Sequence, residues 1–130
     1  MAEMIKVQAT AKGVRQSPRK IGLVSALVRG RTVADALTIL GHTPKRAASP
    51  VAKVIASAKA NAISKGLAEK SLRIDQLQVT SGPRLKRYMP AAQGRALPFM
   101  KRSSHILVVL GGEMKPKKVA AKAETKKEAK

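Results

Sequence analysis

Residues 82–104 read GPRLKRYMPAAQGRALPFMKRSS, and this stretch decides the fold. Gln93-Gly94 lies at its midpoint, where glycine permits a tight turn with positive φ. The pattern predicts a β-hairpin with arms of about ten residues, each roughly 33 Å long at a rise of ~3.3 Å per residue. Arms of that length cannot pack flat on a domain of this size, so we expect the hairpin to project.

The predicted hairpin is basic throughout. It holds no acidic residue, and six cations follow its arms: Arg84, Lys86, Arg87, Arg95, Lys101 and Arg102. An isolated two-stranded ribbon is marginal in water, and repulsion among these cations weakens it further. We therefore expect an anionic partner to surround the hairpin, to contact the six cations and to hold the arms straight. Pro90 and Pro98 fit a free ribbon, because proline is confined to strand edges and bulges.

Both aromatic residues of the chain, Tyr88 and Phe99, lie on the predicted hairpin. They are almost equidistant from its midpoint, and two compatible interpretations follow. They form a cross-strand aromatic pair that stiffens the arms, or they stack on nucleotide bases, for which Tyr88 is the candidate.

The whole domain shares this positive charge. The 130 residues contain 27 Lys and Arg against 7 Asp and Glu, which gives a formal net charge of +20. Residues 1–112 alone contain 20 basic and 4 acidic residues, so the excess is not confined to a tail. Release of counterions from a polyphosphate is the free-energy gain that such a surface offers. Further candidate phosphate ligands lie at expected helix starts, where backbone N–H groups also favour anions: Arg15, Arg19, Lys20, Lys45 and Arg46.

A strand and two short helices are expected ahead of the hairpin. Apolar and polar residues alternate from Ile5 to Ala11, which predicts a half-buried strand. Ser17-Pro18 is typical of a helix start and Gly30 of a helix end. The expected apolar stripe between them comprises Ile21, Val24, Leu27 and Val28. A second helix is expected from the cap at Thr32 to Gly41.

A third helix and two strands are expected in the rest of the domain. Thr43-Pro44 repeats the helix-start signal, and apolar residues at helical spacing continue to Ala62. Pro50 falls within this pattern, so it either kinks the helix or follows a restart capped by Ser49. One strand is expected to begin at Leu77 and another to cover residues 106–110.

Composition excludes several classes of protein. The absence of Cys excludes zinc knuckles, iron–sulfur clusters and disulfides. An aromatic content of 2% argues against RNA platforms that stack several bases on aromatic rings. His42 and His105 lie far apart without carboxylates at ligand spacing, and few carboxylates are available for acid–base chemistry. We therefore expect no metal, no cofactor and no catalytic residue.

Neither a targeting segment nor a membrane span is recognisable. The longest strongly apolar run, residues 106–110, is far too short to cross a bilayer. The first residues lack the features of a signal or transit peptide, so a cytoplasmic location is expected. We expect residues 1–112 to form one RNA-binding domain that includes the hairpin, and residues 113–130, rich in Lys, Ala and Glu, to form a flexible tail.

Three functional classes fit a basic binding protein with a long arm. A structural RNA-binding protein is favoured by the distributed charge. An architectural DNA-bending protein would be a dimer that wedges proline between base steps, but Pro90 and Pro98 are not at the tip. A cationic protein that lies on a membrane would use the apolar helix stripes, yet a packed core needs the same stripes.

Several blocks of the sequence resemble the universal large-subunit ribosomal protein twenty-two family of bacterial type. The resemblance covers roughly residues 5–112 in order, which makes it far more specific than one motif. The blocks are Ser17-Pro18-Arg19-Lys20, Leu27-Val28-Arg29-Gly30, Ser57-Ala58-Lys59-Ala60-Asn61-Ala62, Gly82-Pro83, Met89-Pro90, Gly94-Arg95-Ala96 and Lys101-Arg102-Ser103-Ser104-His105-Ile106.

The resemblance implies an α+β fold, in which three helices pack on a small three-stranded antiparallel sheet and one long β-hairpin projects. It implies binding to large-subunit ribosomal RNA during assembly, beside neighbouring ribosomal proteins and as a monomer within the ribosome. It also implies that the hairpin lines the polypeptide exit tunnel. The tunnel-facing tip, near the nascent polypeptide, would then comprise Ala91, Ala92, Gln93 and Gly94.

The sequence departs from the family pattern near the tip. Family members usually carry basic residues between the Met-Pro and Gly-Arg pairs, whereas residues 91–93 here are uncharged. Thr80 and Ser81 stand where acidic residues usually precede the Gly-Pro pair, and Leu97-Pro98-Phe99 is also unusual. These changes bear on the chemistry of the tip and leave the expected RNA contacts in place.

Overall fold

The computed structural model describes residues 4–114. The expected tail, residues 113–130, lies outside the described residues from residue 115 onward. The described residues form an α+β fold, as expected. Its helices are α1 (Pro18–Val28), α2 (Val33–His42) and α3 (Ala48–Ser64); its strands are β1 (Ile5–Val14), β2 (Arg73–Pro90) and β3 (Ala96–Gly112). Two short 3₁₀ turns, η1 (Glu69–Ser71) and η2 (Ala92–Gly94), precede β2 and β3.

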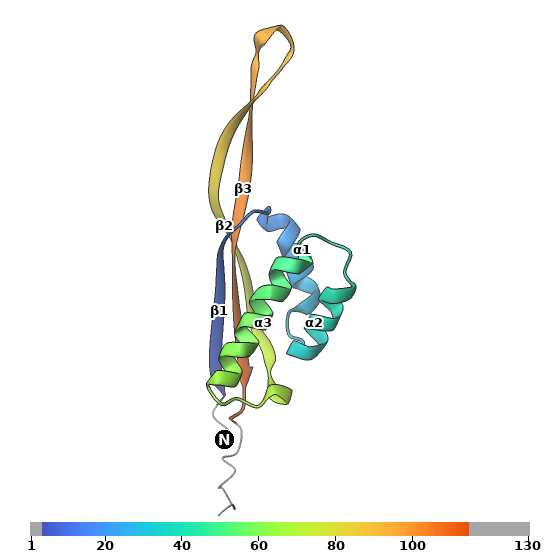
Figure 1. Ribbon diagram of the computed structural model, residues 1–130, viewed down its shortest axis with the longest axis vertical. Helices are drawn as coiled ribbons and strands as arrows, with labels where there is room; N and C mark the ends of the chain where they lie inside the picture. The colour runs from blue at the N-terminus through green and yellow to red at the C-terminus, as the bar shows by residue number, and fades with distance from the viewer. Residues whose placement is uncertain (1–3, 115–130) are drawn as a thin grey trace, which may run out of the picture.

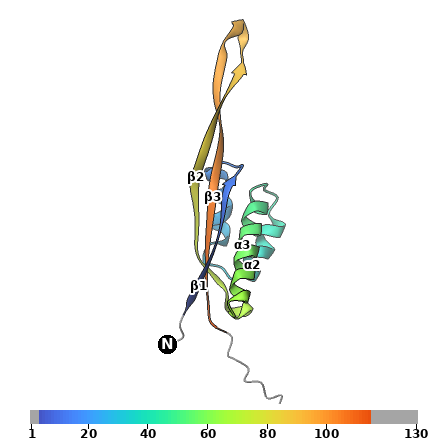
Figure 2. The same ribbon diagram turned by 60° about the vertical axis from the view of Figure 1, so that its left-hand side comes forward.

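The sheet is antiparallel in the order β1-β3-β2, and the three helices cover one of its faces (Figures 1 and 2). Ile106, Val108 and Leu110 of the central strand are fully buried beneath the helices. Leu107 and Val109, which alternate with them, are half-buried on the other face. The predicted strand over residues 106–110 is therefore confirmed as part of a longer element.

Helix α3 fills the centre of the core. Its predicted apolar stripe is confirmed, because every member is buried: Ala47, Ala48, Val51, Val54, Ile55, Ala58 and Ala62. The alanines of this stripe keep the helix close to the sheet, and Val51 and Ile55 fill the space between them. Burial of each such large side chain contributes about 1.5–3 kcal/mol, so this layer anchors the elements that surround it.

The first two helices begin where the sequence predicts. Ser17 precedes α1 and Pro18 is its first residue. Thr32 caps α2, because its Oγ1 accepts a hydrogen bond from the backbone N–H of Asp35. Gly30 follows α1 with a φ of 76°, whereas α2 continues one residue past Gly41.

The predicted start of the third helix at Thr43-Pro44 is wrong. Thr43 instead closes α2, since its backbone N–H bonds to the Leu40 carbonyl and its hydroxyl donates to the Ile39 carbonyl. Helix α3 begins at Ala48. Pro50 is its third residue, where no N–H is needed for the helical ladder, and so it neither kinks the helix nor marks a restart.

The hairpin projects beyond the body, as predicted (Figure 1). Pairing of β1 with β3 ends at Val14 and Ser104, whereas β2 and β3 stay paired out to Pro90 and Ala96. The turn falls at the predicted place, and Gln93 adopts a φ of 59° there. Strand β2 begins at Arg73, earlier than the expected start at Leu77.

A β-bulge lies where the hairpin leaves the body. The pairing register shifts between Ser81 and Arg84, opposite Ser103, whose hydroxyl donates to the Pro83 carbonyl at 2.6 Å. A Cβ on Gly82 would lie 2.7 Å from the Ser103 Oγ, so only glycine fits this close approach. Bulges of this kind bend a strand and increase its twist, which here aims the hairpin away from the body.

Tyr88 and Phe99 do not form the predicted cross-strand pair. Tyr88 pairs with Pro98, and Phe99 pairs with Arg87. Because successive side chains of a strand point to opposite faces, the two aromatic rings lie on opposite faces of the ribbon. Tyr88 is 72% exposed, and base stacking by this residue stays a prediction.

Candidate nucleic-acid interface

The body has two ends that differ in charge. The base end comprises the starts of β1, β2 and α2, the ends of α3 and β3, and η1; the hairpin end comprises the end of β1, the starts of α1 and α3, and the foot of the hairpin (Figure 1). All carboxylates within residues 4–114 lie at the base end: Asp35 on α2, Glu69 in η1, Asp75 near the start of β2, and Glu113 directly after β3. The cations of the hairpin end therefore have no nearby carboxylate among the described residues.

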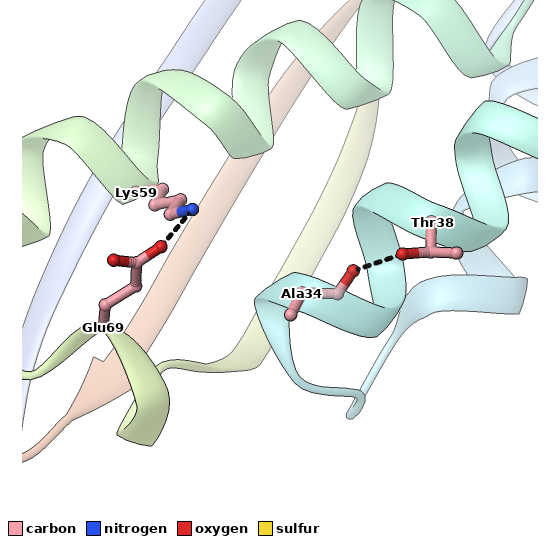
Figure 3. Close-up of polar contacts among 4 residues, drawn as sticks. All are labelled: Ala34, Thr38, Lys59 and Glu69. Carbon is pink, nitrogen blue, oxygen red and sulfur yellow. Dashed lines mark hydrogen bonds and ion pairs between the residues drawn. The ribbon is translucent and has the colours of Figure 1, made fainter.

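Polar groups of the base end satisfy one another. Glu69 forms an ion pair with Lys59 of α3 (Figure 3), and Asp75 forms one with Lys6 of β1 at 3.5 Å. Thr38 of α2 donates its hydroxyl to the Ala34 carbonyl one turn earlier (Figure 3). The backbone of Glu113 is held on both sides, by the N–H of Ala68 and by the hydroxyl of Ser71.

A groove of about 1070 Å³ lies at the hairpin end. Its walls are the start of α1, the loop from Thr43 to Ala47, and the foot of the hairpin on β2 and β3. Seven cations from these three segments line it: Arg15, Lys20, Lys45, Arg46, Arg87, Lys101 and Arg102. All seven were predicted as RNA contacts from the sequence, where they are up to 87 positions apart. The fold thus gathers them around one concave surface, which we call the basic groove.

Two helix N-termini open into the basic groove. Ser17 precedes α1 and Ala47 precedes α3, and neither helix has a side-chain cap or an acidic residue in its first turn. The first N–H groups of a helix lack intrahelical acceptors and carry partial positive charge, which favours anions. Helix α2 ends here, but Thr43 satisfies two of its terminal carbonyls. Helix and side-chain charges therefore attract anions to the same place.

Lys45 and Arg46 occupy a different local position from the one expected. They precede the N-cap residue Ala47 and do not belong to the first turn of α3. The Lys45 carbonyl accepts the backbone N–H of Ala48, which fixes the loop as it enters the helix. Both side chains still line the groove beside the helix N-terminus.

Apolar side chains line the same groove, and the sequence did not reveal them. Leu23 is 76% exposed and Leu27 is 49% exposed on α1, while Leu85 and Met100 of the hairpin foot are each 48% exposed. The prediction that Leu27 belongs to the buried stripe of α1 is wrong. Leu23 and Leu27 are one turn apart, so they form a second stripe beside the buried one. That spacing was the signal that could have revealed it.

The remaining predicted contacts lie outside the basic groove. Arg19 is exposed in the first turn of α1, and the others are exposed along the hairpin: Arg84, Lys86, Tyr88 and Arg95. Ala91 donates its N–H to the Arg95 carbonyl at 2.8 Å and so closes the tip. The tip residues 91–94 lie at the far end of the hairpin from the groove (Figure 1).

Other kinds of site find little support among residues 4–114. No group of three His, Asp or Glu residues gathers there to hold a metal. In the same range no helix combines the length and hydropathy needed to cross a bilayer. A second hollow of about 560 Å³ follows the outer edge of β2, where Arg29 donates to the Leu77 carbonyl and Asp75 is also present. Its mixed charge gives it no preference for anions.

Comparisons with known proteins agree with this geometry. The sequence profile of the family described as ribosomal protein L22p/L17e matches residues 9–111, from β1 through the hairpin to the end of β3. The chain is 50% identical over 107 residues to the large ribosomal subunit protein uL22 of Clostridioides difficile (strain 630). It is 48% identical over 107 residues to the large ribosomal subunit protein uL22 of Clostridium novyi (strain NT). Each alignment covers 82% of this chain and 96% of the relative.

Proposed function

This chain belongs to the ribosomal protein L22p/L17e family, and from that premise we propose that its hairpin end binds large-subunit ribosomal RNA. As a family member it is a structural constituent of the large ribosomal subunit and not an enzyme. The observation that carries the proposal is the convergence of seven cations and two uncapped helix N-termini on one groove. The hairpin extends this positive surface away from the body.

The groove and the hairpin hold the RNA by complementary contacts. Arginine and lysine side chains, together with the N–H groups of α1 and α3, contact phosphates and fix the position of the protein on the RNA. The hairpin enters the folded RNA, which screens the repulsion among the cations of its arms. Because the RNA segments at the groove and along the hairpin then bind one rigid protein, the protein supports assembly of the subunit beside neighbouring ribosomal proteins.

The tip of the hairpin reaches the polypeptide exit tunnel and lies close to the nascent polypeptide. The cations of the arms end at Arg87 and Arg95, and residues 91–94 between them carry no charge. A tip without charge has no hold on phosphate, and it does not retain a charged segment of a passing chain. This arrangement suits a wall along which a polypeptide slides. The protein acts as a monomer within the cytoplasmic ribosome.

Salt dependence of binding tests the RNA proposal. The full chain is titrated onto protein-free large-subunit ribosomal RNA at 50 and 200 mM salt. With about ten phosphate contacts, the affinity should fall by ~10³–10⁵-fold between these concentrations. An affinity that changes little with salt would contradict the proposal. A stable dimer that prefers duplex DNA to this RNA would favour a DNA-bending protein instead.

Crosslinking from the tip tests the tunnel proposal separately. A photoreactive amino acid replaces Gln93 in assembled large subunits that carry a radiolabelled nascent chain. We expect a crosslink to the nascent chain from this position and none from Ile63, an exposed residue of α3. Equal crosslinking from both positions, or none from Gln93, would contradict the tunnel assignment and leave RNA binding untouched.

A further inference from the structure

We propose that the basic groove receives one unpaired nucleotide of the RNA, with its base on the apolar floor and its flanking phosphates on the surrounding cations. The inference rests on the proposed function, that the hairpin end binds RNA. It goes further because it assigns a base-binding subsite to a groove whose charge alone would hold only the RNA backbone.

The floor of the groove is more apolar than phosphate binding requires. Leu23 and Leu27 face it from α1, and Leu85 and Met100 line it from the hairpin foot. Each of these side chains is about half exposed or more, although the body buries a well-formed core elsewhere. A contiguous apolar surface bounded by polar residues marks a binding site. An RNA duplex would fit this floor poorly, because it would place its charged ribose-phosphate backbone against the apolar side chains.

Charge complementarity identifies the occupant. Seven cations line the groove, and none of the described residues that line it is acidic. An apolar protein segment would bury these cations without partners, which is costly. An unpaired nucleotide combines a flat apolar base with anionic phosphates on both sides. Sequence-specific RNA recognition uses such bases, displaced from loops and bulges.

The groove also has the size and the polar group that a base needs. Its volume of about 1070 Å³ lies just above the range of about 300–1,000 Å³ for small-molecule sites, so a base with its flanking phosphates has room in it. Gln16 lines it, and the Oε1 atom of this side chain is buried without a hydrogen-bond partner among the described residues. A carboxamide that turns toward the groove can both donate to and accept from the edge of a base.

Aliphatic side chains provide the stacking surface here. Neither aromatic residue lines the groove. Two leucines one turn apart on α1, with Leu85 contributed by the hairpin, can enclose the two faces of a base between aliphatic groups. Because stacking does not depend on the identity of the base, hydrogen bonds to Gln16 supply whatever selectivity the subsite has.

The first test removes the floor and keeps the charge. Leu23→Ala/Leu27→Ala is compared with Met4→Ala/Ile63→Ala, a control whose two side chains are exposed at the base end, outside both the groove and the hairpin. Both full-length proteins are titrated onto protein-free large-subunit ribosomal RNA. We expect the groove variant to bind about 5- to 20-fold more weakly than wild type, and the control less than twofold. The salt dependence should be unchanged in both, because every phosphate contact remains.

Chemical probing of the RNA locates the base. Wild-type protein should protect at least one unpaired nucleotide from methylation of its base by dimethyl sulfate. The groove variant should lose that protection, whereas protection of the backbone from hydroxyl radicals should persist. A Leu23→Phe variant, which offers a larger stacking face, should bind about threefold more tightly than wild type.

Two results would overturn the inference. One is a groove variant that matches the control in affinity and in base protection. The other is protection of the backbone from hydroxyl radicals with no unpaired base protected from dimethyl sulfate, which would mean that the groove holds only backbone. Either result together with steep salt dependence leaves the proposed RNA binding standing, whereas salt-insensitive binding of wild type removes both. Leu23→Phe alters a residue that is 76% exposed, so it provides a readout independent of core stability.

Discussion

The base end and the hairpin end use the same kinds of element in opposite ways. At the base end, Thr32 caps α2, Asp35 lies in its first turn, and Glu69 pairs with Lys59. At the hairpin end, α1 and α3 begin without side-chain caps, and cations surround them without carboxylates among the described residues. One end meets its own polar requirements, and the other is arranged for an anion that the chain does not supply.

This difference teaches how stability and binding are distributed in the molecule. Caps, ion pairs and the α3 core stabilise the free chain. At the hairpin end, repulsion among the cations and the uncapped helix N-termini lower the stability of the free chain. Bound phosphate relieves both, and this relief contributes to the affinity for RNA. We therefore expect substitutions at the base end to change folding and substitutions at the hairpin end to change RNA binding.

The largest expected effect comes from reversal of charge at each end in turn. Lys20→Glu/Lys45→Glu/Arg102→Glu places three acidic residues in the basic groove, while Lys65→Glu/Lys70→Glu/Arg73→Glu makes the same change in net charge at the base end. Loss of three charge-assisted contacts should weaken binding to large-subunit ribosomal RNA on the order of hundredfold or more. The base-end variant should lose less than tenfold. Filter binding at one salt concentration measures both, and equal losses would abolish the distinction between the two ends.

The next largest expected effect is a loss of folding stability when the glycine at the junction of body and hairpin is replaced. Gly82→Ala places a Cβ 2.7 Å from the Ser103 Oγ and forces out the hydrogen bond to Pro83. The free energy of unfolding in urea should fall by about 1–2 kcal/mol. Gly22→Ala is the matched control, because nothing lies within 4 Å of its Cβ inside α1. It should raise stability by up to about 1 kcal/mol through helix propensity. A Gly82→Ala variant as stable as wild type would show that the bulge is not a tight contact.

Helix caps sharpen the comparison further. Thr32→Ala removes the cap of α2 and should lower the free energy of unfolding by about 1 kcal/mol. Ser17→Ala should change it by only a few tenths, because Ser17 makes no side-chain cap bond. Chemical denaturation of the two variants under identical conditions measures both values. A larger loss from Ser17→Ala would show that the start of α1 is not left open for an anion.

The smallest expected effect concerns the ion pair between Lys59 and Glu69. Its side chains are 29% and 57% exposed, so solvent screens their attraction. Lys59→Ala should lower the free energy of unfolding by about 0.5 kcal/mol or less. The difference from wild type should shrink at 1 M salt, where the screening length is roughly 3 Å. A loss that is large and independent of salt would mean that Lys59 stabilises α3 by packing.

Local signals with one meaning predicted structure well. Gly30 ends the first helix as predicted, because its φ of 76° suits a residue without a side chain. Gln93-Gly94 likewise gave the turn of the hairpin. The prediction at Thr43 was wrong because a threonine before proline can either cap the helix that follows or close the helix that precedes it. In the fold, Thr43 closes α2. The early start of β2 was missed because a bulge between Ile74 and Gln76 breaks the alternation.

The sequence predicted which residues belong to the candidate site, but it did not predict how the fold arranges them around one groove. The acid-free hairpin and the expected helix starts identified the cations, but nothing local places Arg15, Lys45 and Lys101 around one groove. The pair Tyr88 and Phe99 shows the same limit, since a shift of one position in register moves a side chain to the other face. The apolar floor was missed because Leu27 fits a core stripe equally well until the neighbours of α1 are known.

Amide hydrogen exchange tests most directly whether the hairpin end is completed by RNA. Exchange is measured on the full chain, free and bound to large-subunit ribosomal RNA. In the free chain, amides of residues 82–104 should exchange much faster than those of β3 between Ile106 and Leu110, because a charged two-stranded ribbon opens readily. On binding, the hairpin and the starts of α1 and α3 should gain protection, while the base end should change little. A hairpin that is already as protected as the core in the free chain, or protection gained mainly at the base end, would contradict the account.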